Sequence, residues 1–567
     1  MKILLTAINA KYIHSNLAVH SLKAAAGAYS SHVELAEFTI NHRTEEILRE
    51  IYLRKPEVLL FSCYIWNIEY VKELTEECEK VLPGVPIWLG GPEVSYDTEK
   101  FLQQHPQITG ILIGEGEETF RRLAECYVNN DLEKLVYIPG VAFRSRASKK
   151  ADPVINSASK AFCVNPQGSL CDMNKLGFAY EGLEDFEHRI IYYESSRGCP
   201  FSCSYCLSSI DKSVRFRDFE LVKQELQFFL DAKVPQVKFV DRTFNCRRSH
   251  ALAIWEYILK HDNGVTNFHF EIAADLLEEE ELELISRMRP GLIQLEIGVQ
   301  STNPKTIEAI HRRMDLEKLK TNVCRIHAMG NIHQHLDLIA GLPYEDYESF
   351  ARSFNEVFAL QPEQLQLGFL KVLKGSRMYE EAKEYGIVYR GKAPYEVLYS
   401  NWLSFGEMLQ LKAIEEMVEI YYNSHQFQVT LQELLPSFAS AFDFFAQLAD
   451  FYKKEKLDGR NHSRLQRYEI LLDFICRKLP KEEKKYRELL TIDLYRRERV
   501  KSRPAFAPDQ SLYKETLRRI QHTAGKQTHI EAVTECADAI TYLIFDYEKR
   551  SPLTGDALVT KWEEDMV

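Results

Sequence analysis

Several features that would point to particular classes of protein are missing from this sequence of 567 residues. No apolar run approaches the roughly 18 residues that a helix needs to cross a bilayer. The first residues, 1–8, form a short apolar run that reads as a buried strand and not as a signal peptide. Internal repeats and low-complexity tracts are also missing. We therefore expect a cytoplasmic protein that is neither membrane-spanning nor secreted.

An excess of basic charge is missing as well. The 83 Asp and Glu residues outnumber the 71 Lys and Arg residues, which gives a formal net charge of -12. This balance disfavours a nucleic-acid-binding surface. The composition, with 45% hydrophobic and 27% charged residues, is that of a globular protein, and the length predicts two to four domains.

Three of the twelve cysteines, Cys199, Cys203 and Cys206, stand in the pattern Cys-x3-Cys-x2-Cys. The others lack the even spacing of a disulfide framework. Thiolates bind iron–sulfur clusters, and three thiolates leave one iron of a [4Fe–4S] cluster open to a substrate or cofactor. A zinc site wants four ligands, and the nearest upstream histidine, His188, lies outside the usual ligand spacing. We prefer an open iron–sulfur cluster; zinc and structural cysteines are the alternatives.

Residues 1–135 alternate short apolar runs with amphipathic segments. This alternation predicts a doubly wound, Rossmann-like parallel sheet with helices between its strands. In such sheets the ligand binds beyond the carboxyl ends of the strands. The expected strands are 3–8, 33–38, 58–62, 87–90 and 108–113, and the expected helices are 17–29, 44–54, 69–81, 97–104 and 117–128.

The rest of the chain divides into three parts. Residues 136–189 form a connector with a small β element near 138–144, and residues 190–385 return to a strand–helix pattern with the cysteine motif after the first strand. This predicts a barrel with its chemistry at the C-terminal strand ends. Residues 386–567 are poor in glycine and predict a mainly α-helical cap or lid. The expected strands of the barrel are 190–194, 237–240, 268–272, 294–297, 332–338 and 364–370; the expected long helices of the last part are 405–422, 465–479 and 530–547.

The cysteine motif, with Tyr205 directly before its last cysteine, resembles that of the radical S-adenosylmethionine (SAM) superfamily. The resemblance implies a partial (β/α)6 barrel and a [4Fe–4S] cluster whose open iron binds the amino and carboxylate groups of SAM. One electron, from a donor such as flavodoxin or ferredoxin, then cleaves SAM to a 5′-deoxyadenosyl radical. The cofactors carry the difficult chemistry, and the protein positions and shields them.

Later segments resemble the SAM-binding strand ends of this family. Asp241 stands where an acceptor for the methionyl ammonium is expected, although the usual Gly-Gly-Glu is absent, and Glu271 is placed for the ribose or the ammonium. A Gly-x-Gln-Ser run ends at Ser301, and a Gly-Leu-Pro segment begins at Gly341. The SAM-binding candidates that the resemblance implies are Tyr205, Asp241, Glu271, Gln300, Ser301, Arg312 and Gly341.

The glycine-rich strand ends of the first part resemble the cobalamin-binding domain that precedes many radical SAM barrels. The resemblance covers about residues 1–370, and the tail resembles an uncharacterised extension found on some such proteins. It implies four domains: a cobalamin-binding domain at 1–135, the connector at 136–189, the barrel at 190–385 and a helical domain at 386–567. The cobalamin-binding candidates are Asn9, Tyr12, His14, Ser62, Tyr64, Gly90, Gly91, Pro92, Gly114, Glu115, Gly116 and Glu117.

One motif of this family is missing. The Asp-x-His-x-x-Gly sequence, whose histidine binds cobalt, is not found, because His14 has neither the aspartate nor the glycine at the required spacing. A structural or hydrogen-bonding His14 is favoured over a cobalt ligand. Cobalt without a protein histidine favours methyl transfer through methylcobalamin. Trp66 is a candidate for packing on the corrin edge with Tyr64, and Cys163 and Cys171 for substrate contact, although a core role is commoner for such residues.

The resemblance implies a cobalamin-dependent methyltransferase acting on an unactivated carbon. The deoxyadenosyl radical removes a substrate hydrogen, and the carbon radical takes a methyl group from methylcobalamin. A cyclisation or ring rearrangement with the same cofactors is the alternative, because one fold hosts several reactions. A cobalamin- or redox-sensing protein is the non-enzymatic alternative. In Cys203→Ala, a cobalamin sensor should keep its response to the ligand, whereas an enzyme should lose all turnover. Small metabolites, lipids, peptides and RNA stay open as substrates, with RNA disfavoured by the acidic balance.

Overall fold

The computed structural model describes residues 1–144, 162–537 and 539–562. The chain divides into two compact units, and each of them collects segments that are distant in the sequence. The first unit contains Met1–Leu284, Ile310–Arg313 and Leu370–Leu398, and the second contains Ile285–Ala309, Met314–Phe369 and Tyr399–Val567. The four domain boundaries expected from the sequence stay predictions.

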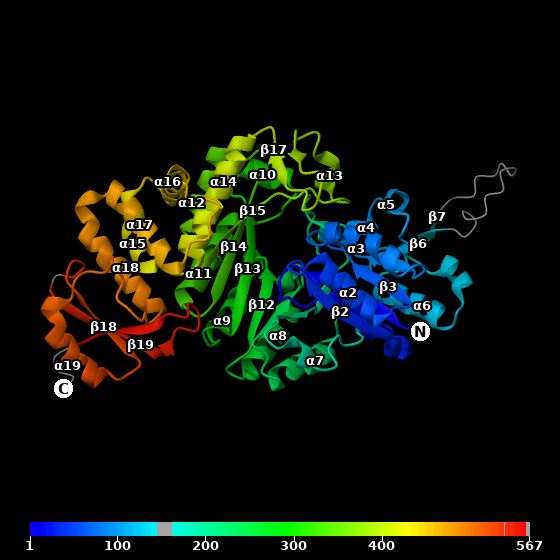
Figure 1. The fold of residues 1–567 in the computed structure, drawn as a ribbon, viewed down its shortest axis with the longest axis horizontal. Coiled ribbons are helices and arrows are strands. Elements are labelled where there is room, and N and C mark those ends of the chain that lie inside the picture. The colour runs from blue at the N-terminus through cyan, green and yellow to red at the C-terminus, as the bar shows by residue number, and fades with distance from the viewer. Residues whose placement is uncertain (145–161, 538, 563–567) are drawn as a thin grey trace. The chain divides into compact units, whose positions relative to one another are not determined.

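The first unit begins with a doubly wound sheet (Figure 1), as predicted. Its parallel strands run in the order β2-β1-β3-β4-β5, and β6 and β7 extend it in antiparallel fashion beyond β5. The strand order reverses between β1 and β3, which is where such sheets bind ligands. The strands are β1 (Ile3–Asn9), β2 (Val33–Thr39), β3 (Val58–Ser62), β4 (Ile87–Gly90), β5 (Gly110–Leu112), β6 (Val141–Arg144) and β7 (Phe162–Val164).

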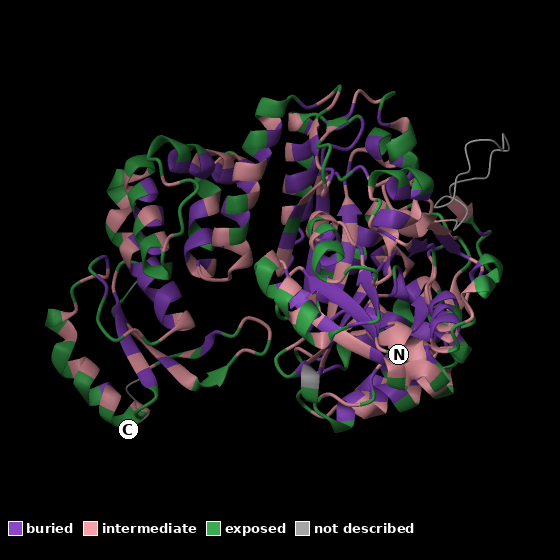
Figure 2. Cartoon of the chain, turned by 45° about the vertical axis from the view of Figure 1, so that its right-hand side comes forward, coloured by how far each residue is buried: buried purple, intermediate pink, exposed green. Residues whose placement is uncertain are grey.

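Helices cover both faces of this sheet. Leu4 and Ile8 of β1 belong to one core with Ile47 of α2, whereas Leu5 belongs to the other core with Phe120 of α6. Alternate residues of a strand point to opposite faces, so a strand buried on both sides is apolar throughout. Figure 2 shows strands buried between helices whose outer surfaces are exposed. The helices are α1 (Leu17–Ala25), α2 (Thr44–Arg54), α3 (Ile68–Val81), α4 (Pro92–Ser95), α5 (Thr98–Gln104) and α6 (Glu117–Val128).

The first unit also holds the beginning of the second α/β region. β11 pairs in parallel with both β8 and β12, and the short strands β9 and β10 pair in antiparallel fashion. The β9–β10 pair therefore closes the base of the loop that carries the three cysteines. The elements are β8 (Ile191–Tyr193), β9 (Ser196–Arg197), β10 (Arg215–Phe216), α7 (Phe219–Asp231), β11 (Gln236–Phe239), α8 (Arg248–Lys260), β12 (Asn267–Ile272), α13 (Arg377–Glu381) and β16 (Val388–Tyr389).

The second unit continues this α/β pattern and then becomes mainly helical. Strand β14 pairs in parallel with β13 and with β15. The α/β elements are β13 (Ile293–Gln300), α10 (Pro304–Ala309), α11 (Leu316–Met329), β14 (His333–Ala340), α12 (Tyr347–Phe358) and β15 (Gln364–Phe369). The later helices are α14 (Phe405–Val418), α15 (Gln428–Leu434), α16 (Ala441–Lys454), α17 (Arg464–Lys478), α18 (Glu483–Arg497) and α19 (Lys514–Ala524).

The predicted helix over 530–547 is wrong. The segment forms β18 (Thr528–Val533) and the first part of β19 (Thr541–Arg550), which pair in antiparallel fashion and are joined by β20 (Ala557–Lys561). The run Thr541-Tyr542-Leu543-Ile544-Phe545 is rich in β-branched and aromatic residues, which favour strands. Among the helices of the described residues, none is long and apolar enough to cross a membrane.

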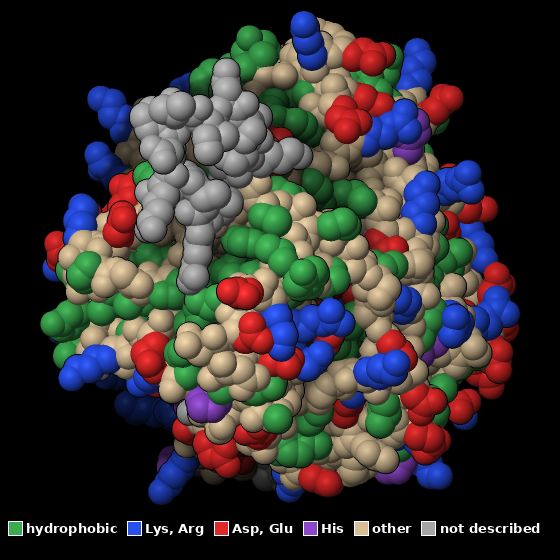
Figure 3. Space-filling model, turned by 90° about the vertical axis from the view of Figure 1, so that its right-hand side faces the viewer, with side chains coloured by type: hydrophobic (Ala, Val, Ile, Leu, Met, Phe, Trp, Pro, Cys, Tyr) green, Lys and Arg blue, Asp and Glu red, His purple; other side chains and the backbone are tan. Residues whose placement is uncertain are grey.

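Charged side chains of both signs are interspersed on the face shown in Figure 3. On the described part of this face, no broad patch of Lys and Arg stands apart from Asp and Glu. A nucleic-acid-binding surface needs a basic patch or stripe.

Candidate functional site

A cavity of about 880 Å³ lies in the first unit, at the carboxyl ends of the doubly wound sheet. Its wall combines residues from three segments: the ends of β1, β3 and β5, the connector at 167–171, and the loop that follows the cysteines. Seven of the cobalamin-binding candidates line it, and they are Asn9, His14, Tyr64, Gly114, Glu115, Gly116 and Glu117. From the second α/β region it takes Tyr192, Glu194, Arg197, Leu207, Ile210, Asp211, Val240 and Arg242.

The other five cobalamin-binding candidates, Tyr12, Ser62, Gly90, Gly91 and Pro92, are not among the residues that line the cavity. Gly91 has a local structural reason. Its φ is +116°, and a Cβ there would lie 2.4 Å from the carbonyl oxygen of Cys63. Only glycine lets the loops after β3 and β4 approach so closely. Contact of these five residues with a corrinoid stays a prediction.

The loop after β1 is joined to β8 by hydrogen bonds. The hydroxyl of Tyr192 lies 2.6 Å from Nδ1 of His14, and Ser15 donates to the carbonyl of Ile190. Burial lowers the pKa of His14, with a smaller contribution from Lys11. His14 is thus a hydrogen-bonded imidazole on the cavity wall. The Asn9 amide is buried and donates to Glu37 and to the His14 carbonyl, so it holds the loop together.

Two aromatic rings stand after β3 on the cavity wall. Tyr64 and Trp66 stack with their ring centroids 4.5 Å apart and their planes inclined by 4°, and the Trp66 indole donates to the carbonyl of Ile8. Burial raises the pKa of the Tyr64 phenol to about 12. The pair presents a rigid, flat apolar surface with a neutral hydroxyl at the switch point of the sheet.

The three motif cysteines lie on one loop and form no disulfide. Cys199 and Cys203 are buried, and Cys206 is half-buried. Burial raises the pKa of Cys199, and the thiols of Cys206 and Cys203 lie close enough to contribute. Gly198, before the motif, has φ +101°, and a Cβ there would lie 2.3 Å from the carbonyl of Ser213. Among the described residues no three His, Cys, Asp or Glu side chains converge closely enough to hold a single metal ion. Three thiols on one tightly folded loop nevertheless match the ligand chemistry of a [4Fe–4S] cluster with one open iron.

Two of the SAM-binding candidates lie beside this loop. Nη1 of Arg312 is 3.7 Å from the Cys203 sulfur and 3.5 Å from the Tyr205 hydroxyl. The Arg312 guanidinium thus places a positive charge beside the cysteine loop.

Asp241, the predicted acceptor of the SAM ammonium, has a different set of partners in the structure. It is fully buried, and its carboxylate accepts from the hydroxyls of Ser195 and Ser196 at 2.7 and 2.6 Å and from the Ser195 amide at 3.0 Å. Ser195 Oγ also lies 2.9 Å from Nε2 of His250. Asp241 thereby fixes the segment that leads into the cysteine loop. A direct contact with SAM stays a prediction.

The remaining candidates lie at strand ends. Glu271 is half-buried near the end of β12. In the second unit, Gln300 ends β13 with φ +71°, and its buried Oε1 has no hydrogen-bond partner among the described residues. A non-glycine residue in this conformation is strained, and such strain concentrates at functional sites. Ser301 is buried and donates to Glu345, and Gly341 follows β14 with φ +89°. These placements do not test SAM binding.

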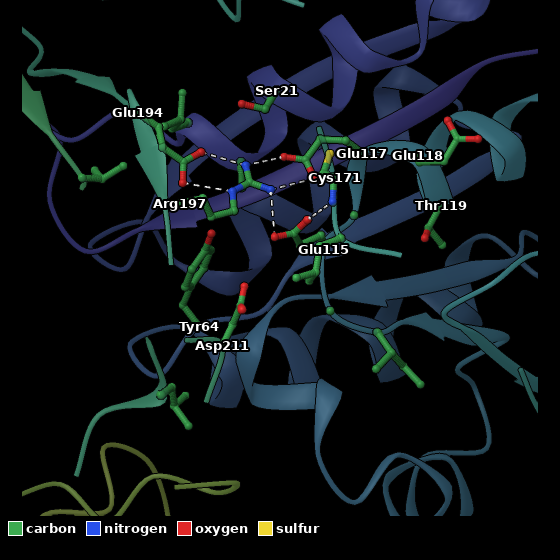
Figure 4. A pocket seen from close by; sticks show the side chains of 18 of the residues that line it. Ser21, Tyr64, Glu115, Glu117, Glu118, Thr119, Cys171, Glu194, Arg197 and Asp211 are labelled. Atoms are coloured by element: carbon green, nitrogen blue, oxygen red, sulfur yellow. Dashed lines mark hydrogen bonds and ion pairs between the residues drawn. The ribbon is translucent and has the colours of Figure 1, made fainter. Parts of the chain in front are cut away.

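A network of ion pairs joins the two α/β regions at the cavity (Figure 4). The Arg197 guanidinium lies 2.7 Å from Glu117, 2.7 Å from Glu194 and 3.6 Å from Glu115. Arg215 lies opposite Arg197 in the β9–β10 pair, and Glu115 is 2.5 Å from it. Like charges directly opposite one another repel, so Glu115 between the two arginines stabilises the hairpin that carries the cysteine loop.

The sequence pointed to Glu115 and Glu117 of this network, but not to the arginines that pair with them. Arg197 is two residues before Cys199, so its place beside the motif was a usable signal. No sequence signal pointed to Arg215 or Tyr192, because their roles depend on pairing across distant segments. Arg242, directly after Asp241, lines the cavity and was also missed. The candidate Cys171 lines it too, and its backbone amide donates to Glu115.

Comparison with known proteins agrees with this architecture. A family model described as B12 binding domain matches residues 3–124, and one described as Radical SAM superfamily matches residues 193–357. The chain joins a B12 binding domain to a radical SAM domain. The cavity is therefore lined from both domains. A third model, described as a protein of unknown function (DUF4080), matches residues 383–547 and confirms the uncharacterised extension expected after the radical SAM domain.

Named relatives cover part of the chain. The cobalamin-dependent radical SAM methyltransferase TokK of Streptomyces tokunonensis is 26% identical over 354 residues, which are 59% of this chain and 50% of that protein. The anaerobic magnesium-protoporphyrin IX monomethyl ester cyclase of Rubrivivax gelatinosus is 21% identical over 338 residues, which are 58% of this chain and 59% of that protein. The chain thus spans about half the length of the curated relatives it matches.

One solved structure resembles nearly the whole chain. The cobalamin-dependent S-adenosylmethionine radical enzyme OxsB, with aqua-cobalamin and S-adenosylmethionine bound, matches with a TM-score of 0.53 and 14% identity. The match covers 91% of this chain and 80% of that one. At this identity the likeness concerns the fold, and it confirms the predicted succession of a B12 binding domain, a radical SAM domain and a mainly helical C-terminal region.

Proposed function

We propose that this protein is a cobalamin-dependent radical SAM enzyme that transfers a methyl group to an unactivated carbon. The observation that carries the proposal is the cavity, because one continuous wall contains the strand ends of the B12 binding domain and the residues that follow the cluster cysteines. Two cofactors that act on one substrate must face the same space. Similarity to TokK, which is named as such a methyltransferase, supports the same reaction.

The residues for each cofactor follow from their donor chemistry. Cys199, Cys203 and Cys206 would bind a [4Fe–4S] cluster, with Arg312 beside it. The stacked Tyr64 and Trp66 and the glycine-rich loop at 114–116 would hold a corrinoid. When bound, the cluster and SAM supply a hydrogen-abstracting radical, and cobalamin supplies the methyl group.

The protein's own contribution is position and shielding. Arg197 and Arg215, through Glu115 and Glu117, fix the β9–β10 base of the cluster loop against the start of α6. Leu207 and Ile210 and the connector residue Leu170 provide apolar wall. A wall of this kind excludes water from a reactive carbon radical. Burial acts to raise the pKa of Glu115, but its hydrogen bonds to Arg215 and to the Cys171 amide outweigh this and lower that pKa, so this carboxylate holds no transferable proton at neutral pH.

Anaerobic reconstitution tests the proposal. The protein should bind four iron atoms and one corrinoid, measured by metal analysis and optical spectra, and should convert SAM to 5′-deoxyadenosine. With its substrate it should give a methylated product. Iron near four without any bound corrinoid would remove cobalamin from the proposal, and 5′-deoxyadenosine without any methylated product would remove methyl transfer.

A cyclisation is the second candidate. It rests on the similarity to the protoporphyrin ester cyclase of Rubrivivax gelatinosus, which covers 58% of the chain, close to the 59% that the similarity to TokK covers. Both reactions begin with removal of a hydrogen from carbon, so the cavity serves either. The discriminating measurement is the mass of the product, because methylation adds a carbon and cyclisation does not.

A further inference from the structure

Among the described residues, the charged side chains of the cavity wall are paired with one exception. Glu194 and Glu117 are paired with Arg197, and Glu115 and Asp211 with Arg215. Within the described residues, Arg242 lines the same cavity, is exposed, and forms no ion pair. It is the cation of this wall whose charge is not already compensated by a carboxylate.

The second paired cation of the wall offers a comparison. Arg122 lies 2.6 Å from Glu118, and its side chain is 44% exposed. Arg242 and Arg122 are both exposed arginines of one cavity, but only Arg122 has a carboxylate beside it. Solvent exposure alone therefore does not explain why Arg242 has no partner.

The position of Arg242 also suits a ligand. It directly follows the buried Asp241 at the carboxyl end of β11, so a fixed backbone carries it. On the opposite domain, Tyr64 is close enough for the Arg242 charge to act on its phenol, which burial keeps neutral. A guanidinium and a neutral hydroxyl are both hydrogen-bond donors, and together they match an anionic oxygen group.

We propose that Arg242 is an anion-binding residue of this cavity, placed to bind a carboxylate or phosphate group. Besides the carboxylate of SAM, which is expected on the open iron of the cluster, two sources supply such a group: the substrate, and the phosphodiester of the cobalamin nucleotide tail. In either case Arg242 selects for a charged ligand, since a guanidinium binds these groups with two parallel hydrogen bonds. The proposal deepens the function proposed above and rests on it for the identity of both sources.

Arginine modification tests the proposal without a known substrate. Cluster-loaded protein is treated with phenylglyoxal under anaerobic conditions, and the modified arginines are located by peptide mass spectrometry. Arg242 should react faster than Arg122, because a carboxylate protects the latter. Inorganic phosphate or propionate should slow the modification of Arg242 and leave Arg122 unchanged. The proposal is overturned if Arg242 reacts no faster than Arg122, or if neither anion nor any corrinoid slows its modification.

Corrinoids distinguish the two sources. Protection by hydroxocobalamin but not by cobinamide, which lacks the nucleotide phosphate, assigns Arg242 to the cobalamin tail. Protection by phosphate or propionate in protein already loaded with corrinoid assigns it to the substrate. Equal protection by both corrinoids, with no effect of the free anions, means that the corrin ring merely covers the side chain, and this outcome also overturns the proposal.

Binding by variants gives a second readout. If the cobalamin tail is the ligand, Arg242→Gln should weaken hydroxocobalamin binding about tenfold or more and leave cobinamide binding unchanged. If the substrate is the ligand, both corrinoids should bind Arg242→Gln as they bind the unaltered protein. Arg122→Gln is the matched control and should change neither. If the unaltered protein binds no corrinoid at all, the proposed function is refuted. Protection of Arg242 by phosphate or propionate would still test whether this residue binds anions.

Discussion

Arg197 shows how much one side chain holds together at this site. It lies within 3.6 Å of three carboxylates, two of them from the B12 binding domain. Burying a charge costs several kcal/mol unless oppositely charged partners surround it. Removing one partner leaves the remaining buried charges unpaired, and the fold then bears that cost. The arginine and its carboxylates therefore act as one unit.

We expect Arg197→Ala to loosen the start of α6, because Glu117 is buried and would lose its partner. The predicted cost is about 3 kcal/mol, which corresponds to about 100-fold faster local opening. Hydrogen–deuterium exchange of peptides covering 110–128 measures it. Arg121→Ala is the control, since Arg121 pairs with Glu118 on the exposed side of the same helix and should change exchange less than about fivefold. Equal effects of the two variants would contradict the role of Arg197.

A second buried charge makes a pH prediction. Asp493 of α18 accepts from the amides of Val429 and Thr430 at the start of α15, and burial raises its pKa to about 6 from the usual 3.8. Because the folded-state pKa is the higher one, the folded state holds the proton more tightly. The contribution of Asp493 to stability is therefore full below about pH 4 and declines as the pH rises to about 6.

Asp493→Asn cannot titrate, so it should remove this decline. Relative to the variant, the unaltered protein should lose about 3 kcal/mol of local stability between about pH 4 and 6. Hydrogen–deuterium exchange of peptides covering 428–434, compared at each pH, cancels the intrinsic pH dependence of exchange. Parallel profiles for the two proteins would show that Asp493 keeps an ordinary pKa.

The roles of residues were predictable only where the residues that act together are close in the sequence. The three cysteines lie within eight residues of one another, so their spacing alone indicated the cluster. Asp241 was chosen by its place in a strand-end motif, but its hydrogen bonds to Ser195 and Ser196 come from a segment 45 residues away. No local pattern reveals such a partner.

At the scale of elements, two loops of the B12 binding domain depend on one backbone conformation. The loops after β3 and β4 meet at Gly91, whose positive φ and close contact with Cys63 both exclude a side chain. The glycine therefore serves the packing of the loops after β3 and β4, whether or not it touches a ligand.

Gly91→Ala should cost about 3 kcal/mol or more, because it adds a clash to an unfavourable φ. Gly84→Ala is the matched control. Gly84 also has a positive φ, of +87°, but nothing lies within 4 Å of a Cβ there, so only the backbone cost of about 1 kcal/mol applies. Thermal unfolding midpoints compare the two. A Gly91→Ala protein as stable as Gly84→Ala would mean that the loops can separate without cost.

Elements whose apolar residues follow one clear periodicity were predicted well. Segments whose apolar residues fit both helical and strand spacing were not. All five strands expected in residues 1–135 are present, because runs buried on both faces are apolar and bounded by polar turns. Around 530–547 the apolar residues satisfied a helical spacing, but the run at 541–545 forms the middle strand of a sheet between its partner strands β18 and β20. Such pairing is a tertiary effect that a window of sequence does not contain.

At the scale of the whole molecule, the segment Leu370–Leu398 belongs to the first unit although it follows the strands of the second. The Tyr395 hydroxyl donates to the buried carboxylate of Glu93 in the B12 binding domain at 2.8 Å, and the Met378 amide donates to the carbonyl of Ser204 within the cysteine motif. One segment thus supports both predicted cofactor sites.

Tyr395→Phe should destabilise the first unit although the two partners are 302 residues apart. Glu93 would keep its burial and lose its donor, at a cost of about 1–3 kcal/mol. Burial already raises the pKa of Glu93, and losing the hydroxyl raises it further, so the cost should be larger at pH 8 than at pH 5.

Exchange of peptides covering 87–104 measures this effect. Tyr389→Phe is the control, because the Tyr389 hydroxyl, in the same segment, has no hydrogen bond to any other described residue. If the two variants behave alike at both pH values, the Glu93 contact contributes nothing to the fold.

The same segment sets an order of events during synthesis. Glu93 leaves the ribosome early, but its partner Tyr395 follows only after about 300 further residues have been made. At translation rates of about 5–20 residues per second, the B12 binding domain waits on the order of half a minute before its cover arrives. During that interval the Glu93 carboxylate lacks its hydrogen-bond donor, so a nascent B12 binding domain with this group still uncovered is a natural client for a chaperone.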